Sequence, residues 1–213
     1  SNNIANAGTN GFKKSEAQFE DLYHSQHNNS TQKATGMGVK TIKPRQSFAQ
    51  GSLQATNGSL DLAIMGEGFF VLGQPLGRTT ATSGDQRAFT RDGSFQLDRE
   101  GNLVNTDGLP LLGLGQTPIK IPFLLSSEEN TNPELLSEIS VDSEGQISAT
   151  YGLDNTVKVG QIELAEFQNR NGLQPIGESF FVETTASGEA IIANPLEGSF
   201  GKLVQGALES SNV

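Results

Sequence analysis

Residues 57–70, NGSLDLAIMGEGFF, constrain the fold of this chain more than any other stretch. Apolar side chains alternate here with polar or small ones, at Leu60, Leu62 and Ile64. An alternation with period two predicts a β-strand with one buried face. Glycines on both sides of Glu67 suit a turn whose backbone reaches positive φ. We therefore expect a central hairpin whose second strand is the apolar run Phe69–Leu72.

Two adjacent phenylalanines begin that second strand. Side chains of neighbouring residues in a strand point to opposite faces, so Phe69 and Phe70 can each anchor a different layer of the core. We expect the remaining strands to pack on this hairpin, which gives an all-β fold rich in glycine and hairpins.

The composition is that of a folded chain with a phenylalanine-based core. Hydrophobic residues make up 34% of the 213 residues and another 25 are glycine, which together match the usual apolar share of about 45–50%. This length fits one large or two small domains. With 12 Phe, 2 Tyr and no Trp, few rings remain as platforms for stacking nucleobases or sugars.

Charge and cysteine content exclude several classes of function. A formal net charge of −10 repels phosphate backbones and anionic lipids, so we expect no nucleic-acid partner. No apolar run approaches the length of about 18 residues that a membrane helix needs, so we expect no membrane insertion. Without cysteine the chain has no disulfide, thiolate metal site or thiol nucleophile. The start lacks the features of a secretory signal, and we interpret the chain as an excised fragment or mature core.

Residues 1–38 are polar and rich in asparagine, and we expect them to form an extended, partly irregular arm. The spacing of Ser15 and Gln18 is that of a capping box, which predicts a short helix through about His24. The large apolar side chains of the arm are Phe12, Phe19, Leu22 and Tyr23. They can dock either on the same molecule or on a neighbouring one.

Residues 39–205 have the pattern of a β-rich core domain. Strands are expected at 39–43, 69–72, 88–91, 157–167, 180–184 and 190–192, with short edge strands within 108–122 and an exposed loop at 73–87. The alternation within 157–167 slips beside Gly160, which indicates a β-bulge. The acidic stretch 126–138 is expected to be a loop with one helical turn at 133–136, and residues 169–172 are expected to form a turn.

One pattern occurs twice, in residues 95–104 and 139–148. Both segments place an aspartate, Asp98 or Asp142, three residues before a glycine between two apolar runs. An aspartate at this position accepts hydrogen bonds from backbone N–H groups ahead of it, and the glycine adopts the left-handed conformation. We therefore predict the same tight turn twice. A calcium loop would need further oxygen ligands that neither segment supplies.

No motif for catalysis or cofactor binding stands out. His24 and His27 have a spacing that permits a metal pair, but they lie in a polar loop without a further ligand, and we expect no metal or cofactor. Ser179 lacks the G-x-S-x-G elbow of a serine hydrolase. A carboxylate pair for glycoside hydrolysis depends on three-dimensional distances. A secreted carbohydrate-active β protein therefore remains the alternative from another functional class.

Five segments resemble the bacterial flagellar rod and hook protein family. They are SNNIANAGTNGFKKSEAQFEDL at 1–22, GSLDLAIMGEGFF at 58–70, FTRDGSFQLDREGNLVNTDGLPLL at 89–112, GLQPIGESFF at 172–181 and GALESSNV at 206–213. They follow one another in order along essentially the whole chain. The resemblance implies a non-enzymatic axial subunit, exported by the flagellar type III system and polymerised beyond the inner membrane.

The resemblance also implies the expected partners. Terminal helices of the family form an inner tube, so residues 1–6 should be the end of the first helix and residues 206–213 the start of the C-terminal helix segment, with the helix itself beginning at 211–213. The 213 residues without these helices should be monomeric. The compact length favours the distal rod of the basal body, with the hook as the alternative, and neighbouring rod, hook and bushing-ring proteins as partners. The candidate assembly contacts are Asn3, Asn6, Phe12, Phe19, Leu22, Tyr23 and Asn212.

Overall fold

The computed structural model describes residues 15–16, 19–20, 40–41, 45–46, 48–77, 87–128, 130–177 and 179–210. Within these ranges all regular elements are β-strands apart from two short 3-10 turns, η1 (Leu114–Gln116) and η2 (Arg170–Gly172). The prediction of an all-β fold is confirmed. The same ranges contain no helix with the length and hydropathy needed to cross a bilayer.

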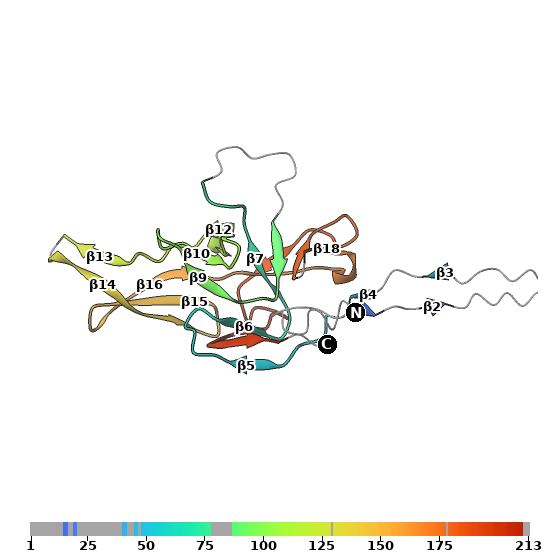
Figure 1. Ribbon diagram of the computed structural model, residues 1–213, viewed down its shortest axis with the longest axis horizontal. Helices are drawn as coiled ribbons and strands as arrows, with labels where there is room; N and C mark the ends of the chain where they lie inside the picture. Colours follow the sequence, from blue (N-terminus) through green and yellow to red (C-terminus); the bar gives the residue numbers. More distant parts are fainter. Residues whose placement is uncertain are drawn as a thin grey trace, which may run out of the picture.

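A six-stranded antiparallel sheet forms the centre of the protein (Figure 1). Its order is β18 (Gln174–Ile176), β19 (Phe180–Val182), β8 (Ala88–Thr90), β7 (Phe69–Leu72), β17 (Leu164–Glu166) and β20 (Ile191–Ala193). The predicted strands at 69–72, 88–91, 180–184 and 190–192 all belong to this sheet.

A four-stranded antiparallel sheet extends from the central one at the left of Figure 1. Its order is β13 (Leu124–Ser127), β14 (Asn130–Val141), β15 (Gln146–Tyr151) and β16 (Asn155–Gln161). The bulge predicted beside Gly160 is confirmed, because Ile147 pairs with Gly160 while Ser148 pairs with Lys158. The predicted strand 157–167 is split between β16 and β17, since the chain passes from one sheet to the other there.

Two-stranded ladders complete the fold. They are β5 (Leu53–Ala55) with β22 (Ala207–Glu209), β6 (Leu62–Met65) with β21 (Lys202–Gln205), β9 (Phe95–Leu97) with β10 (Leu103–Asn105), β11 (Leu112–Gly113) with β12 (Thr117–Pro118), β1 (Ser15–Glu16) with β4 (Arg45–Gln46), and β2 (Phe19–Glu20) with β3 (Lys40–Thr41). Because β1 and β2 are strands, the helix predicted from residue 15 is wrong at these positions. The four described residues of β1 and β2 pair with β4 and β3 instead of forming a helical turn.

Phe69 and Phe70 point into two different apolar clusters, as predicted. Phe70 packs with the larger cluster between the two sheets, which includes Leu62, Leu103, Ile147 and Tyr151. Phe69 packs with the other cluster, on the opposite face of the six-stranded sheet, together with Val71, Phe89, Ala165, Phe167, Leu173 and Phe181. Both faces of this sheet are therefore covered, and every residue of β7 is buried.

The predicted central hairpin is wrong. β6 pairs with β21, and β7 pairs with β8 and β17, so the two strands follow each other without pairing together. Gly66 and Gly68 do reach positive φ, at 115° and 126°. They redirect the chain from one ladder into another sheet. Leu62, Ala63 and Ile64 are all fully buried, because β6 is covered on both faces.

The acidic stretch 126–138 also differs from its prediction, because it belongs to the hairpin of β13 and β14 and contains no helical turn. Polar residues suit this hairpin, since one of its faces is exposed to solvent. Pro133 lies where the register of β13 shifts between Leu125 and Ser127. A proline at such an irregular position removes no ladder hydrogen bond that the register requires.

The repeated turn is confirmed at both predicted positions. Asp98 Oδ1 accepts hydrogen bonds from the backbone N–H of Glu100 and Asn102, and Asp142 Oδ1 accepts them from Glu144 and Gln146. The following Gly101 and Gly145 have φ of 85° and 84°. A third copy escaped prediction. There Asn105 Oδ1 accepts from Asp107 and Leu109 N–H, and Gly108 has φ 80°.

Candidate functional site

The first and last strands of the described core lie side by side. In the ladder of β5 and β22, Leu53 pairs with Glu209 and Ala55 with Ala207. The pairing continues at Ser52, whose carbonyl accepts the Ser210 N–H at 2.8 Å and whose hydroxyl lies 2.7 Å from that of Ser210. Both directions of the chain therefore leave the core from one place. We call this place the chain-end junction, and define it as residues 50–55 together with 207–210.

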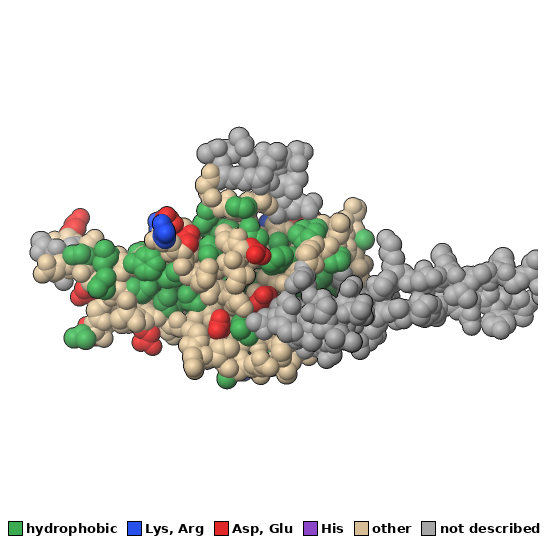
Figure 2. All heavy atoms as spheres, viewed as in Figure 1, with side chains coloured by type: hydrophobic (Ala, Val, Ile, Leu, Met, Phe, Trp, Pro, Cys, Tyr) green, Lys and Arg blue, Asp and Glu red, His purple; other side chains and the backbone are tan. Residues whose placement is uncertain are grey.

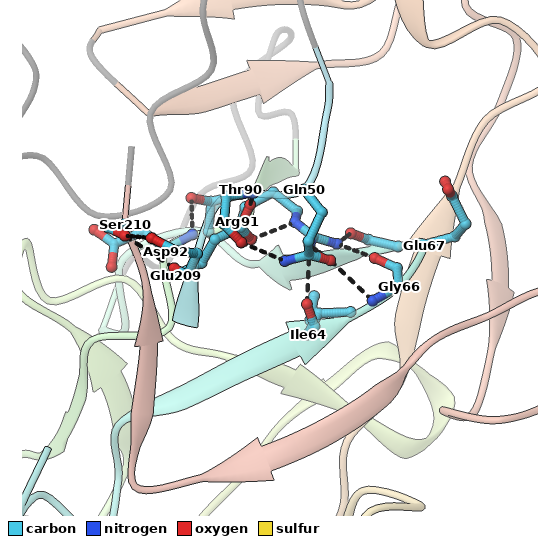
Figure 3. A network of polar contacts seen from close by, with 12 residues as sticks. Gln50, Ile64, Gly66, Glu67, Thr90, Arg91, Asp92, Glu209 and Ser210 are labelled. Atoms are coloured by element: carbon cyan, nitrogen blue, oxygen red, sulfur yellow. Dashed lines mark hydrogen bonds and ion pairs between the residues drawn. The ribbon is translucent and has the colours of Figure 1, made fainter. Parts of the chain in front are cut away.

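Arg91 fixes the chain-end junction to the central sheet (Figure 3). It follows β8 directly, and only 4% of the residue is exposed. Its Nε donates to Glu209 Oε2 at 2.8 Å, Nη1 donates to the carbonyls of Gly66 and Gly68 at 2.7 and 2.8 Å, and Nη2 donates to Gln50 Oε1 and the Ile64 carbonyl at 3.0 and 2.9 Å. These contacts use all five N–H donors that a guanidinium has.

Glu209 is the counter-ion of this buried arginine and is itself 1% exposed. Its second oxygen, Oε1, accepts the Gly51 N–H at 2.9 Å. Gln50 Oε1 is shared between Arg91 and the Gly66 N–H, which lies 2.9 Å away. The network therefore joins the start of the core, the β6–β7 turn, the end of β8 and the last strand.

The β6–β7 turn presents two carbonyls to Arg91 because of its glycines. A Cβ added to Gly66 would lie 2.9 Å from the Gly201 Cα, in addition to the strain of φ 115°. Positive φ is readily adopted only by glycine, so this sequence permits the backbone path that aims both carbonyls at one cation.

A second charged group lies beside the junction. Arg170 binds Glu166 with both ends of its guanidinium, through Nε at 2.8 Å and Nη2 at 2.6 Å, and also pairs with Glu67. Burial raises the pKa of Glu166, an effect reduced by the Phe167 N–H and by the charge of Arg91. Burial lowers the pKa of Arg170.

Two hollows in the described part of the chain lack the form of a ligand site. One hollow lies between Phe48, Gln50, Glu67, Arg91 and Arg170, and its volume is about 70 Å³. Small-molecule sites are larger, with volumes of about 300–1,000 Å³. A more open one of about 250 Å³ includes Glu144 and Glu197 and has no aromatic lining. Glu197 there accepts hydrogen bonds from Asn194, which is a local turn contact. This gives no support to carbohydrate chemistry.

The described residues contain no group of three or more His, Asp or Glu placed to hold a metal ion. His24 and His27 lie outside the described ranges. Of the candidate assembly contacts, only Phe19 lies in a described element, β2, where its backbone pairs with Thr41. The others, Asn3, Asn6, Phe12, Leu22, Tyr23 and Asn212, lie outside them, so their roles stay predictions. In the segment 206–213, Ala207–Glu209 is strand β22, and 211–213 lie outside the described ranges.

Sequence reasoning missed Arg91 and Glu209 as a pair. A signal was present, because Arg91, the Gly66–Gly68 turn and Glu209 each come from one of the segments that carry the family resemblance. Those three segments are distant in sequence and meet at one guanidinium.

Comparisons with known proteins agree with this resemblance. Residues 63–149 match the family model described as flagellar hook protein FlgE/F/G D1 domain. The flagellar basal-body rod protein FlgG of Buchnera aphidicola (Acyrthosiphon pisum) is 39% identical over 224 residues, which cover all of this chain and 78% of that protein. FlgG of Bacillus subtilis is 36% identical, covering all of this chain and 77% of that protein.

A hook protein is also similar, but over a smaller share. The flagellar hook protein FlgE of Caulobacter vibrioides is 38% identical over 160 residues, which cover 75% of this chain and 25% of that protein. Rod proteins match the whole of this chain, and residues 63–149 match the FlgE/F/G D1 domain model. The chain belongs to the flagellar basal-body rod and hook protein family.

Proposed function

We propose that this chain is a structural subunit of the distal rod of the flagellar basal body. The observation that carries the proposal is the chain-end junction, where the N-terminal and C-terminal directions of the chain leave the core side by side. Terminal segments that start from one place can enter the same central tube together. The β core then stands outside that tube as a single attached body.

The buried network supports a mechanical role for the core. A drive shaft transmits torque between its terminal segments and its outer domain, so their connection must not swivel. Arg91 binds both sides of the exit point, through Glu209 and Gln50, and uses its other three hydrogen bonds on carbonyls of β6 and the β6–β7 turn. Hydrogen bonds to charged groups are the stronger ones in proteins, at about 1.5–3 kcal/mol each.

The hook is the second candidate, because the hook protein of Caulobacter vibrioides matches 75% of this chain. The rod is favoured because the rod relatives match all of this chain, whereas that hook protein matches 75% of it.

The proposed function includes location, route and partners. We place the subunit in the periplasmic part of the flagellum, after export through the flagellar type III system. Its partners are further copies, joined through the terminal segments, and neighbouring rod, hook and bushing-ring proteins. We expect neither catalytic activity nor a cofactor. Residues 1–38 act as an arm, 39–205 as the core and 206–213 as the connection to the last helix.

Electron microscopy of the full-length protein tests the proposal. Concentrated full-length protein should form tubes or short rods, whereas residues 1–213 alone should sediment as a monomer. Full-length protein that stays dispersed under all conditions would contradict an axial role, as would turnover of polysaccharides in a reducing-sugar assay.

Deletion of the gene separates rod from hook. Cells without the protein should build basal bodies that stop before the distal rod is complete. Complete rods that lack only the hook would favour the hook assignment instead.

A further inference from the structure

Three leucines stand exposed at the far end of the four-stranded sheet. Leu124 is 51% exposed, Leu135 is 68% exposed and Leu153, in the turn between β15 and β16, is fully exposed at 101%. Turn positions usually carry polar residues, so a fully exposed leucine there is unusual. We name these three residues the leucine patch.

Backbone pairing places the members of the leucine patch together. Leu124 and Leu135 are direct cross-strand partners in β13 and β14, which puts both side chains on one face with Cβ atoms about 4.5–5.5 Å apart. Gly152, the neighbour of Leu153, donates its N–H to the Leu135 carbonyl at 2.8 Å. Figure 2 shows apolar surface gathered at this end of the molecule, with acidic side chains around it.

The leucine patch does not belong to the core of its own sheet. The other face of the same sheet carries the buried side chains, among them Ile147, Ala149 and Tyr151, each 0% exposed. The Tyr151 hydroxyl donates to the Pro122 carbonyl at 2.6 Å and fixes that inner face to the core. In the isolated protein, at least half of each leucine side chain in the patch therefore stays in contact with water.

The edges of this sheet are protected against pairing with another strand. β13 is four residues long and irregular between Leu125 and Ser127. β16, at the other edge, is bulged at Val159 and carries the exposed Lys158. Short edge strands, β-bulges and exposed lysines on edge strands each prevent another strand from pairing with a sheet edge. A partner would therefore contact the face of the sheet through side chains.

We propose that the leucine patch docks on a neighbouring copy of this chain, a contact that rests on the proposed function as a polymerising subunit. Three leucines expose a few hundred Å² at most, against the roughly 800 Å² per partner of a stable interface. Glu134 and Asp154 are sequence neighbours of Leu135 and Leu153, Glu128 and Glu138 lie three or four residues from the patch along the chain, and the net charge is −10, so free copies repel one another.

A patch that is too small and too acidic to hold a free dimer needs an occupant that other contacts keep nearby. A second copy joined through the terminal segments meets this condition, because tethering raises its effective concentration to the millimolar range. The hairpins of the leucine patch lie away from the chain-end junction (Figure 1). A contact there resists rotation of neighbouring cores against one another, which contacts at the junction alone cannot do.

Site-specific crosslinking in the full-length protein tests this docking. The chain has no cysteine, so Leu153→Cys gives a unique site within it for a benzophenone label. Ile191→Cys is the matched control, since Ile191 is 55% exposed and lies in edge strand β20 of the other sheet. On irradiation of the assembled polymer, the Leu153 label should give a crosslinked dimer at least fivefold more abundantly than the Ile191 label.

The outcomes separate this inference from the proposed function. A polymer that forms normally but gives no dimer, or gives a crosslink only to another protein, overturns the docking and leaves the rod assignment intact. Absence of any polymer from the unsubstituted protein overturns both. A second variant checks the contact without a label: Leu135→Ser with Leu153→Ser should leave the urea midpoint of the monomer unchanged and shorten the polymers formed at equal concentration. Polymers of unchanged length would contradict the proposal.

Discussion

Removing Arg91, the buried cation that binds the chain-end junction, is the sharpest test of the structure. Arg91→Met keeps much of the side-chain volume but leaves Glu209 buried with Gly51 N–H, while the Gly66, Gly68 and Ile64 carbonyls lose their donor. Breaking one partner of a buried pair costs about 3–5 kcal/mol. Since a domain has only about 5–15 kcal/mol in total, this single change should remove a large part of its stability.

The expected shift can be measured by heat or urea. For a chain of this size, each kcal/mol moves Tm by roughly 2–4 °C, so a cost of about 3–5 kcal/mol should lower the Tm of Arg91→Met by about 6–20 °C. A double-mutant cycle isolates the pair. Glu209→Leu alone should also cost about 3–5 kcal/mol, while Arg91→Met with Glu209→Leu should cost at least about 2 kcal/mol less than the sum.

Additive costs in that cycle would refute the reasoning, because they would mean that Arg91 and Glu209 do not stabilise each other. Arg87→Met is the matched control. Its pair with Glu183 is 3.0 Å long but partly exposed, with 33% and 25% of the two side chains accessible. Partly exposed pairs of this kind contribute about 0–1 kcal/mol, so the control should change Tm little.

Hydrogen exchange gives an independent check of the same network. A three-residue strand near a chain end normally frays, with little free energy of local opening. The Gly206 and Ser210 amides, bonded to Asp61 and Ser52, should instead exchange only with global unfolding, and Arg91→Met should make them exchange locally. Fast exchange at both amides in the unsubstituted protein would contradict the conclusion that Arg91 holds β22 to the core.

Three further predictions concern the core and its turns. Gly108→Ala should cost about 1–2 kcal/mol through its positive φ alone, whereas Gly101→Ala should cost clearly more in urea unfolding, because its Cβ would lie 2.3 Å from the Ile121 carbonyl oxygen. Desolvation raises the pKa of Asp98, but hydrogen bonds from Asn102, Glu100 and Gly101 outweigh it and lower the pKa below 3.8. The stability that this lowered pKa gives is present above pH 3.8 and is lost as the pH falls through the lowered pKa. In urea titrations, Asp98→Asn should lack this acid dependence. Phe70→Ala, at a fully buried site, should cost about 3–5 kcal/mol by calorimetry.

Features that depend on a few neighbouring residues were predictable from sequence. The turn at Asp98 needs only an aspartate, a glycine and the N–H groups of Glu100 and Asn102, so five consecutive residues determine it. The opposite directions of Phe69 and Phe70 follow from strand geometry alone. The third turn, at Asn105, was missed although asparagine offers the same acceptor oxygen as aspartate, and the pattern should have been searched with either residue.

Strand partners could not be predicted in the same way. The pattern of 57–70 shows two strands and a turn, and a hairpin is the shortest way to pair them. β6 pairs instead with β21, nearly at the other end of the chain, and no local signal states which distant strand will cover it. The acidic residues of 126–138 likewise indicate only that the segment is exposed to water. A loop and a hairpin with an exposed face both meet this condition, so the pattern does not distinguish them.

The chain-end junction was hidden for a related reason. In the sequence, Arg91 looks like an ordinary polar residue at the end of a strand. Its counter-ion, Glu209, comes 118 positions later. Burial of a cation is a property of the assembled fold, because it requires four backbone and side-chain acceptors from separate segments in addition to Glu209.

The ion pair of Arg91 and Glu209 also specifies the register of β22, which an apolar pair in the same place would not do. Successive residues of a strand face opposite sides, so a slip of β22 by one residue would turn Glu209 away from Arg91 and break their ion pair. An apolar pair in their place can equal the stability of a buried ion pair but tolerates such a slip. Arg91→Met with Glu209→Leu should therefore fold, yet hold β22 less uniquely, with exchange at Ser210 faster than its global stability requires. Protection at Ser210 equal to that of the core in this double variant would show that backbone pairing and apolar contacts set the register without the charges.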